Sequence, residues 1–233
     1  MTRALGLLLA VVGWGCSGLA EGEGGVVGIE VSVPGPDTVE VGESIQLSAR
    51  PLDKNGDSVA TTVTWVSADP AASVDAATGV LTGVTVGTAR VQATVGALGS
   101  GLITFAVVAP ADTLVLPGDS VFAVPGDTVT LPAMVTRLDS FNPAGPLSGR
   151  GVIYTITSPD PAAATPSVVL TGGVVSDTLA TASDGTATGR LTVLAGSTPP
   201  PPPDTVIVTV RAERTRGAAV PGSGQRFIVV FTP

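Results

Sequence analysis

The 233-residue chain is predicted to be all-β, with two tandem antiparallel β-sandwiches after an N-terminal signal segment. Three observations predict this class. Val and Thr alternate with polar residues in short runs, as half-buried strands require. The 30 Gly and 20 Pro residues fall between these runs, where turns are expected. The order of runs and turns is found twice along the chain, which indicates two copies of one architecture.

The N-terminus has the pattern of an export signal. Arg3 precedes an apolar segment over residues 4–12. This segment is too short for a membrane-spanning helix, which needs about 20 residues, and it has the length of a signal-peptide core. We therefore predict a signal peptide over residues 1–15.

Cys16 is the single cysteine of the chain, so it cannot form an internal disulfide. Gly15-Cys16 resembles the end of a bacterial lipobox, which predicts lipidation of Cys16 and attachment to a membrane. Residues 16–25 are small, flexible and acidic, as expected of a tether. Cleavage after Ala20 by an ordinary signal peptidase is the alternative. The predicted location is the cell surface or outer membrane, and a secreted protein under the alternative.

The first sandwich is predicted over residues 26–109, around the stretch at residues 61–83. That stretch begins as a strand with Trp65 on one face, and Asp69-Pro70 ends it because proline cannot donate to a ladder. A large aromatic residue on a central strand, followed by short strands, is typical of a β-sandwich core. The pair Asn55-Gly56 predicts a tight hairpin upstream.

The second sandwich is predicted over residues 110–233, including a Pro-rich loop at 197–204 that precedes its last two strands. Only about 30 residues follow that loop, too few for a domain without extra staples. Three segments of the first sandwich recur in order in the second: 41–47 as 125–131, 63–72 as 154–163, and 87–95 as 185–193.

These motifs carry a family resemblance. EVGESIQLSA, VTWVSADPAASVDAATGVLTG and GTARVQATV, in roughly residues 27–108, resemble the group 2 bacterial immunoglobulin-like domain of surface proteins. VIYTIT and SDGTATGRLTV in the second copy are similar to bacterial immunoglobulin-like domains of the invasin–intimin type. The resemblance implies immunoglobulin-like folds and extracellular spacer or adhesion modules. It implies no catalytic residues.

Without disulfides, each sandwich must be stabilised by its apolar core. The residues expected in the two cores are Ile45, Leu47, Trp65, Val91 and Phe105 in the first, and Val129, Leu131, Tyr154, Leu191 and Phe227 in the second.

Composition argues against several functions. The net charge of −8, with a single lysine, argues against a nucleic-acid partner because that requires clustered basic residues. The absence of histidine excludes His-based catalytic triads and His-liganded metals. Many aspartates stand at turns, as Asp69 does before Pro70, where their side chains bond the local backbone. We therefore predict no enzyme activity, no cofactor and no metal.

The alternation of Asp53, Asn55 and Asp57 is similar to the start of a calcium loop, but the later glycine and bidentate glutamate are missing. A tight hairpin is the better interpretation. The predicted function is a non-enzymatic exported spacer, stalk or adhesion module whose protein or glycan ligand is unknown. A glycan- or peptidoglycan-binding surface module is the alternative, and it would need exposed aromatic side chains in a chain with 3% aromatic residues.

Overall fold

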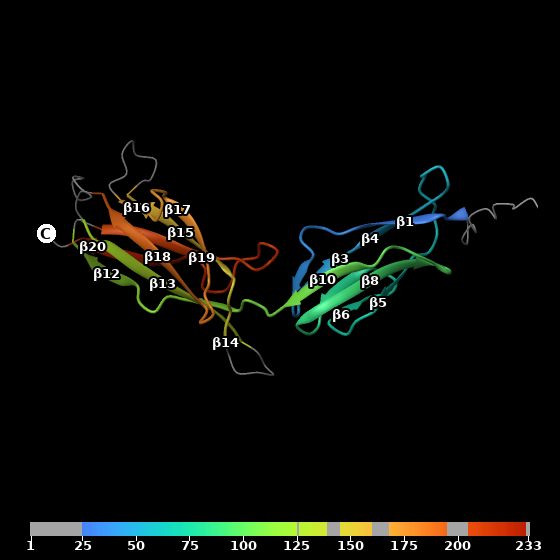
Figure 1. Cartoon of the computed structure of the whole chain (residues 1–233), viewed down its shortest axis with the longest axis horizontal. Helices are drawn as coiled ribbons and strands as arrows, with labels where there is room; N and C mark the ends of the chain where they lie inside the picture. The colour runs from blue at the N-terminus through green and yellow to red at the C-terminus, as the bar shows by residue number, and fades with distance from the viewer. Residues whose placement is uncertain (1–24, 125, 139–144, 160–167, 195–204, 232–233) are drawn as a thin grey trace, which may run out of the picture.

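The computed structural model describes residues 25–124, 126–138, 145–159, 168–194 and 205–231. It consists of two β-sandwiches joined end to end, with β1 near one end of the long axis and β20 near the other (Figure 1). The predicted signal peptide, Cys16 and the Pro-rich loop at 197–204 lie outside the described residues.

The first sandwich contains β1–β10. Its strands are β1 (Gly28–Ser32), β2 (Thr38–Glu40), β3 (Ser44–Gln46), β4 (Ser48–Leu52), β5 (Thr64–Ser67), β6 (Ala72–Val74), β7 (Val80–Gly83), β8 (Gly87–Val95), β9 (Leu98–Gly99) and β10 (Ile103–Val108). One layer is the sheet β2-β10-β8-β5, with β9 also paired to β8. The other layer holds the pair β1-β4 and the sheet β3-β7-β6.

The second sandwich contains β11–β20. Its strands are β11 (Thr113–Val115), β12 (Ser120–Ala123), β13 (Thr128–Arg137), β14 (Gly145–Pro146), β15 (Gly151–Ser158), β16 (Val168–Leu170), β17 (Ser176–Ala180), β18 (Thr186–Val193), β19 (Thr205–Ala212) and β20 (Gln225–Phe231). Its two sheets are β12-β20-β19-β15-β17 and β11-β13-β18-β16, with β14 on β13.

The two sandwiches share one topology. The sheet β2-β10-β8-β5 corresponds to β12-β20-β19-β15, and β3-β7-β6 corresponds to β13-β18-β16. In both, the two strands at one edge are parallel: β2 pairs with β10 and β12 with β20. This two-layer arrangement is the immunoglobulin-like sandwich that the sequence predicts.

One of the three pairs of recurring segments does not correspond to equivalent strands. Residues 87–95 and 185–193 read alike, but they are not equivalent strands. β8 lies between β10 and β5, whereas β18 lies between β13 and β16 in the other layer. The equivalent of β8 is β19, which follows the Pro-rich loop. Alternation of Thr and Val after a turn occurs on many strands, so it does not distinguish one strand from another.

Each sandwich has its own core, because the strands alternate between buried and exposed side chains. β8 shows the pattern, with Ala89, Val91, Ala93 and Val95 buried. One cluster of buried residues runs from Val39 to Val107 and the other from Ala111 to Phe231, and they share no member. The chain therefore folds around two separate cores.

Candidate functional site: the junction between the domains

Residues 109–112 link β10 to β11, and the second sandwich packs around this short linker. Ala111 is fully buried and belongs to the second core. Asp112 donates its backbone N–H to the carbonyl of Thr136 at 3.0 Å. The turn between β19 and β20 reaches back toward the first sandwich, and Arg150 approaches from the residue before β15. The junction is thus built from elements far apart in sequence.

Glu40, at the end of β2, lies at the centre of the junction and is fully buried. Its Oε1 is 3.1 Å from Nη1 of Arg150 and accepts the backbone N–H of Thr215 at 3.3 Å. Its Oε2 accepts the backbone N–H of Ala111 at 3.2 Å and lies 3.8 Å from Nε of Arg214. The carboxylate therefore has hydrogen-bond or ionic partners on both oxygens.

A second acid supports this arrangement. Glu43 accepts the backbone N–H of Glu40 at 2.9 Å and the hydroxyl of Thr215 at 3.4 Å through Oε2. Arg214 also contacts Asp112 of the linker, with Nη2 3.4 Å from Oδ1. Arg150 donates to the carbonyl of Ala109. Acids of the first domain and the linker thus face arginines of the second domain.

A further contact lies at the other end of β2. Nη1 of Arg216 donates to the carbonyl of Pro36 at 2.6 Å and lies 3.5 Å from that of Thr38. The turn between β19 and β20 therefore contacts the strand at two places, near Pro36 and at Glu40.

Sequence reasoning did not find this cluster. Glu40 falls in an alternating strand between Val39 and Val41, where a polar residue is expected to face solvent. The equivalent of Glu40 in the second sandwich is Val124, because the turns that follow them match. The backbone N–H of Glu43 donates to the carbonyl of Glu40, and that of Asp127 donates to the carbonyl of Val124. The sequence signal for a special role of Glu40 was that an acid occupies this position in one repeat and an apolar residue occupies it in the other.

The ten predicted core residues are all buried, with exposed fractions of 7% or less. Trp65 packs over Gly79, whose backbone has a φ of +74°. A Cβ on Gly79 would lie 2.6 Å from the indole Nε1, so only glycine fits beneath the ring. Tyr154 donates its hydroxyl to the carbonyl of Ala187 at 2.8 Å. Burial raises the pKa of Tyr154 to about 12, and the backbone of Gly189 and Ala133 partly opposes that rise.

Several carboxylates stabilise turns, as their sequence positions predict. Asp53 accepts the backbone N–H groups of Asp57 and Asn55, which lowers its pKa. Hydrogen bonds from Thr78 and Ala77 lower the pKa of Asp75.

Asp69 pairs with the guanidinium of Arg90, which lowers the pKa of that carboxyl. Within the described ranges, no group of three or more His, Cys, Asp or Glu residues could hold a metal ion.

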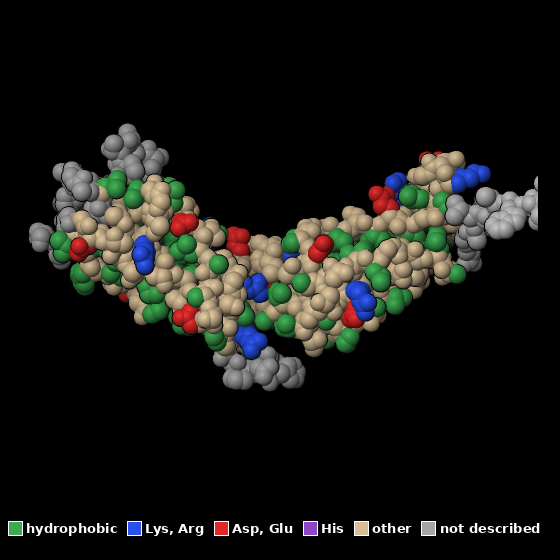
Figure 2. Space-filling view, viewed as in Figure 1, with side chains coloured by type: hydrophobic (Ala, Val, Ile, Leu, Met, Phe, Trp, Pro, Cys, Tyr) green, Lys and Arg blue, Asp and Glu red, His purple; other side chains and the backbone are tan. Residues whose placement is uncertain are grey.

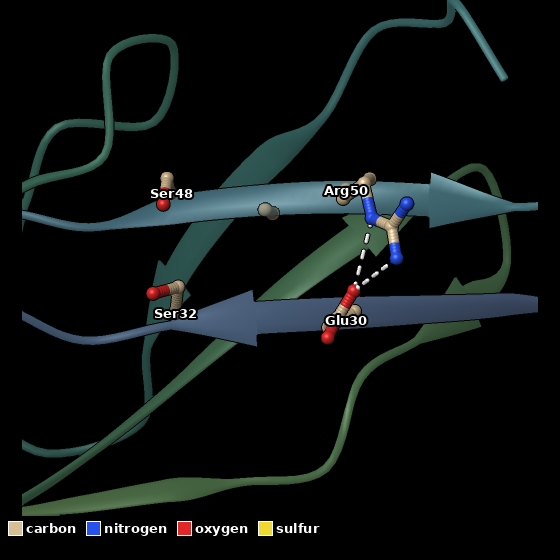
Figure 3. Close-up of a pocket in the computed structure, with 5 residues that line it drawn as sticks. Glu30, Ser32, Ser48 and Arg50 are labelled. Carbon is tan, nitrogen blue, oxygen red and sulfur yellow. Dashed lines mark hydrogen bonds and ion pairs between the residues drawn. The ribbon is translucent and has the colours of Figure 1, made fainter. Parts of the chain in front are cut away.

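A depression of about 280 Å³ lies over β1 and β4, lined by Glu30, Ser32, Ser48, Ala49 and Arg50 (Figure 3). Its volume is slightly below the ~300–1,000 Å³ typical of ligand pockets, and it has no aromatic side chain. Glu30 and Arg50 form an ion pair of 2.7 Å across it, and both side chains are more than half exposed. This depression is a surface feature between paired strands.

The aromatic side chains are mostly interior. Trp65, Tyr154, Phe105, Phe227 and Phe231 are buried. Among the described residues only Phe122 is an exposed aromatic, at 71%. On the face in Figure 2, charged side chains are scattered and neither sign gathers into a patch. The described surface therefore offers one exposed aromatic side chain, that of Phe122, on which a sugar ring could stack.

Residues 26–105 match the bacterial Ig-like domain (group 2) family. No curated protein matches the chain. Among solved structures, the chain is similar to the Yersinia pseudotuberculosis adhesin InvE, at 16% identity and a TM-score of 0.39, with 88% of this chain and 59% of that one covered. The chain thus spans less than two thirds of that adhesin structure.

Two further solved structures show a comparable likeness. Domains 4 and 5 of the S-layer protein SbsC match at 16% identity and a TM-score of 0.33, covering 89% of this chain and 99% of that one. The three N-terminal domains of the bacteriophage RB49 highly immunogenic outer capsid protein match at 12% identity and a TM-score of 0.38, covering 88% and 71%.

The described part of the chain contains no helix that is long and apolar enough to cross a membrane.

Proposed function

We propose that the chain is a non-enzymatic cell-surface module that acts as a spacer or stalk. The observation that carries this proposal is the end-to-end arrangement of two sandwiches around a polar junction (Figure 1). The match of residues 26–105 to a bacterial Ig-like domain family supports the same class. Asp53 and Asp75 stabilise turns and Glu40 stabilises the junction, and these structural roles support a module without catalysis.

We also propose export through the signal segment and attachment to a membrane through lipid on Cys16. The tether at 16–25 would then join the lipid to the first sandwich. Intact-mass measurement of the mature protein tests this step separately. A mass that includes diacylglycerol on Cys16 supports the anchor, and a chain starting at Glu21 shows cleavage after Ala20 instead.

The spacer role is tested by measuring height above a membrane. Fluorophores are placed at two exposed strand positions, through Thr64→Cys in the first domain and Thr178→Cys in the second. Energy transfer to a lipid dye is then compared on supported bilayers carrying the lipidated chain. A spacer predicts weaker transfer from position 178 than from position 64. Equal transfer from both positions means that the module lies along the membrane, which would refute the role.

A glycan-binding module is not favoured. Trp65 and Tyr154, the aromatic residues best suited to stacking on sugars, are in the cores. Binding on a glycan array that is lost in Phe122→Ala would reverse this conclusion.

A further inference from the structure

Glu40 is the only fully buried acid in the described part of the chain. The groups that contact its carboxylate, namely Arg150, Arg214 and two backbone N–H groups, belong to the linker or to the second domain. None of them belongs to the first sandwich, which carries Glu40 itself. The burial of this charge therefore depends on where the second domain sits.

We propose that Glu40 locks the orientation of the two domains, so that the junction is a rigid elbow with one preferred angle. Domains joined by short polar interfaces usually move relative to one another, so a fixed angle has to have a specific cause. The inference concerns the junction itself and holds whether or not the chain is a spacer. If the chain is a spacer, the elbow sets the direction of the second domain as well as its height.

Burial of the Glu40 charge makes one domain orientation specific. A buried ion pair adds little net stability, because removing both charges from water offsets most of their attraction. A buried carboxylate without partners, however, is strongly destabilising. Rotating the second domain while Glu40 stays covered would leave this charge unpaired. Rotations that expose Glu40 would separate it from Arg150, whose side chain is 12% exposed. The observed orientation satisfies both groups.

A second contact prevents rotation about Glu40. Arg216 donates to the carbonyl of Pro36, at the start of the segment that leads into β2, while Glu40 lies at the end of that strand. Two attachment points along one strand fix the direction of the second domain relative to that strand as well as its position. The linker of residues 109–112 is also held on both sides, by Glu40 at Ala111 and by Thr136 at Asp112.

Distance measurement between spin labels tests the lock in solution. Labels are attached through Thr64→Cys and Thr178→Cys in the full mature chain, with Cys16→Ser so that no other thiol is present. The parent is expected to give a single narrow distance peak. Glu40→Gln removes the charge at nearly constant shape, and we expect loss of that narrow peak.

The matched control is Glu30→Gln. It also removes an acid from an ion pair with an arginine, but Glu30 lies on the surface of the first domain, and we expect the narrow peak to remain. Trp65 fluorescence during unfolding shows that the first domain of each variant is folded, and the absorbance of Tyr154 does the same for the second domain. If Glu40→Gln does not fold, Arg214→Gln is used, because it removes one contact to Glu40 and leaves Arg150 in place.

A broad distribution in the parent would overturn the proposal, as would a peak equally narrow in the parent and in the folded junction variant. These outcomes leave the membrane-height measurement unaffected, so failure of the lock and failure of the spacer role are distinguishable.

Discussion

Tyr154 provides a direct measure of how well the second core excludes water. Its side chain is fully buried, and its hydroxyl donates a hydrogen bond to the carbonyl of Ala187. Ionising this hydroxyl would place a negative charge in an apolar cluster and oppose it to a carbonyl oxygen. Burial accordingly raises the pKa of Tyr154 from 10.0 to about 12.

This shift makes the free energy of unfolding depend on alkaline pH. The folded pKa lies above the unfolded one, so the folded chain holds its proton more tightly. The contribution is fully present below pH 10 and is lost as the pH rises from 10 to about 12. Two pKa units correspond to a loss of roughly 2.7 kcal/mol from this one group.

The assay is simple because Tyr154 is the only tyrosine. Absorbance of the tyrosinate ion is followed against pH in the folded chain and in denaturant, and a midpoint about two units higher in the folded chain is expected. Denaturant unfolding at pH 8 and pH 11.5 gives the stability. Tyr154→Phe is the control, and its stability should fall less between these two pH values. A folded-state midpoint near 10 would refute the argument, because the ring would then be in contact with water.

Three further predictions concern the first domain. Trp65→Ala should lower the free energy of unfolding by about 3–5 kcal/mol through the cavity it leaves, and a thermal melt without loss would remove Trp65 from the core. Gly79→Ala should cost more than the ~1–2 kcal/mol of a positive φ, because its Cβ would meet the indole. Gly56→Ala is the matched control, since Gly56 has a φ of +85° and open space around it, and equal losses in denaturant unfolding would contradict the packing argument. Acid should destabilise this domain, because the pKa values of Asp53, Asp69 and Asp75 are all lowered from 3.8. Their contribution is present above pH 3.8 and is lost as the pH falls through the folded values, so Trp65-monitored urea unfolding at pH 5 and pH 3 should show a loss that Asp75→Asn reduces.

The parts of the fold that follow from local pattern could be predicted from sequence. The alternation of apolar and polar residues predicts that Val91 and Leu131 lie in the cores, and both are buried. Asn55-Gly56 predicts the hairpin, and the carboxylate of Asp53 accepts a backbone N–H within it. These predictions succeed because side-chain direction alternates along a strand and because few residues adopt a positive φ.

Partners distant in sequence could not be predicted in this way. Glu40 and Arg214 are 174 positions apart and meet only once both domains are folded. The local pattern predicts that a lone acid on a strand is exposed, because the charged partners that allow its burial lie elsewhere in the sequence. Residues 87–95 and 185–193 resemble each other in sequence although they form strands in different layers, because runs of Thr and Val suit strands in either layer.

The parallel pairing at one edge of each sandwich determines how the chain responds to tension. Pulling the chain ends apart drives the parallel neighbours β2 and β10 past each other along their length, and likewise β12 and β20. The ladder bonds between them lie across the direction of force, so they share the load and must rupture together rather than one after another. We expect each domain to give a separate high-force rupture event in single-molecule pulling. Gradual extension at low force would contradict this expectation.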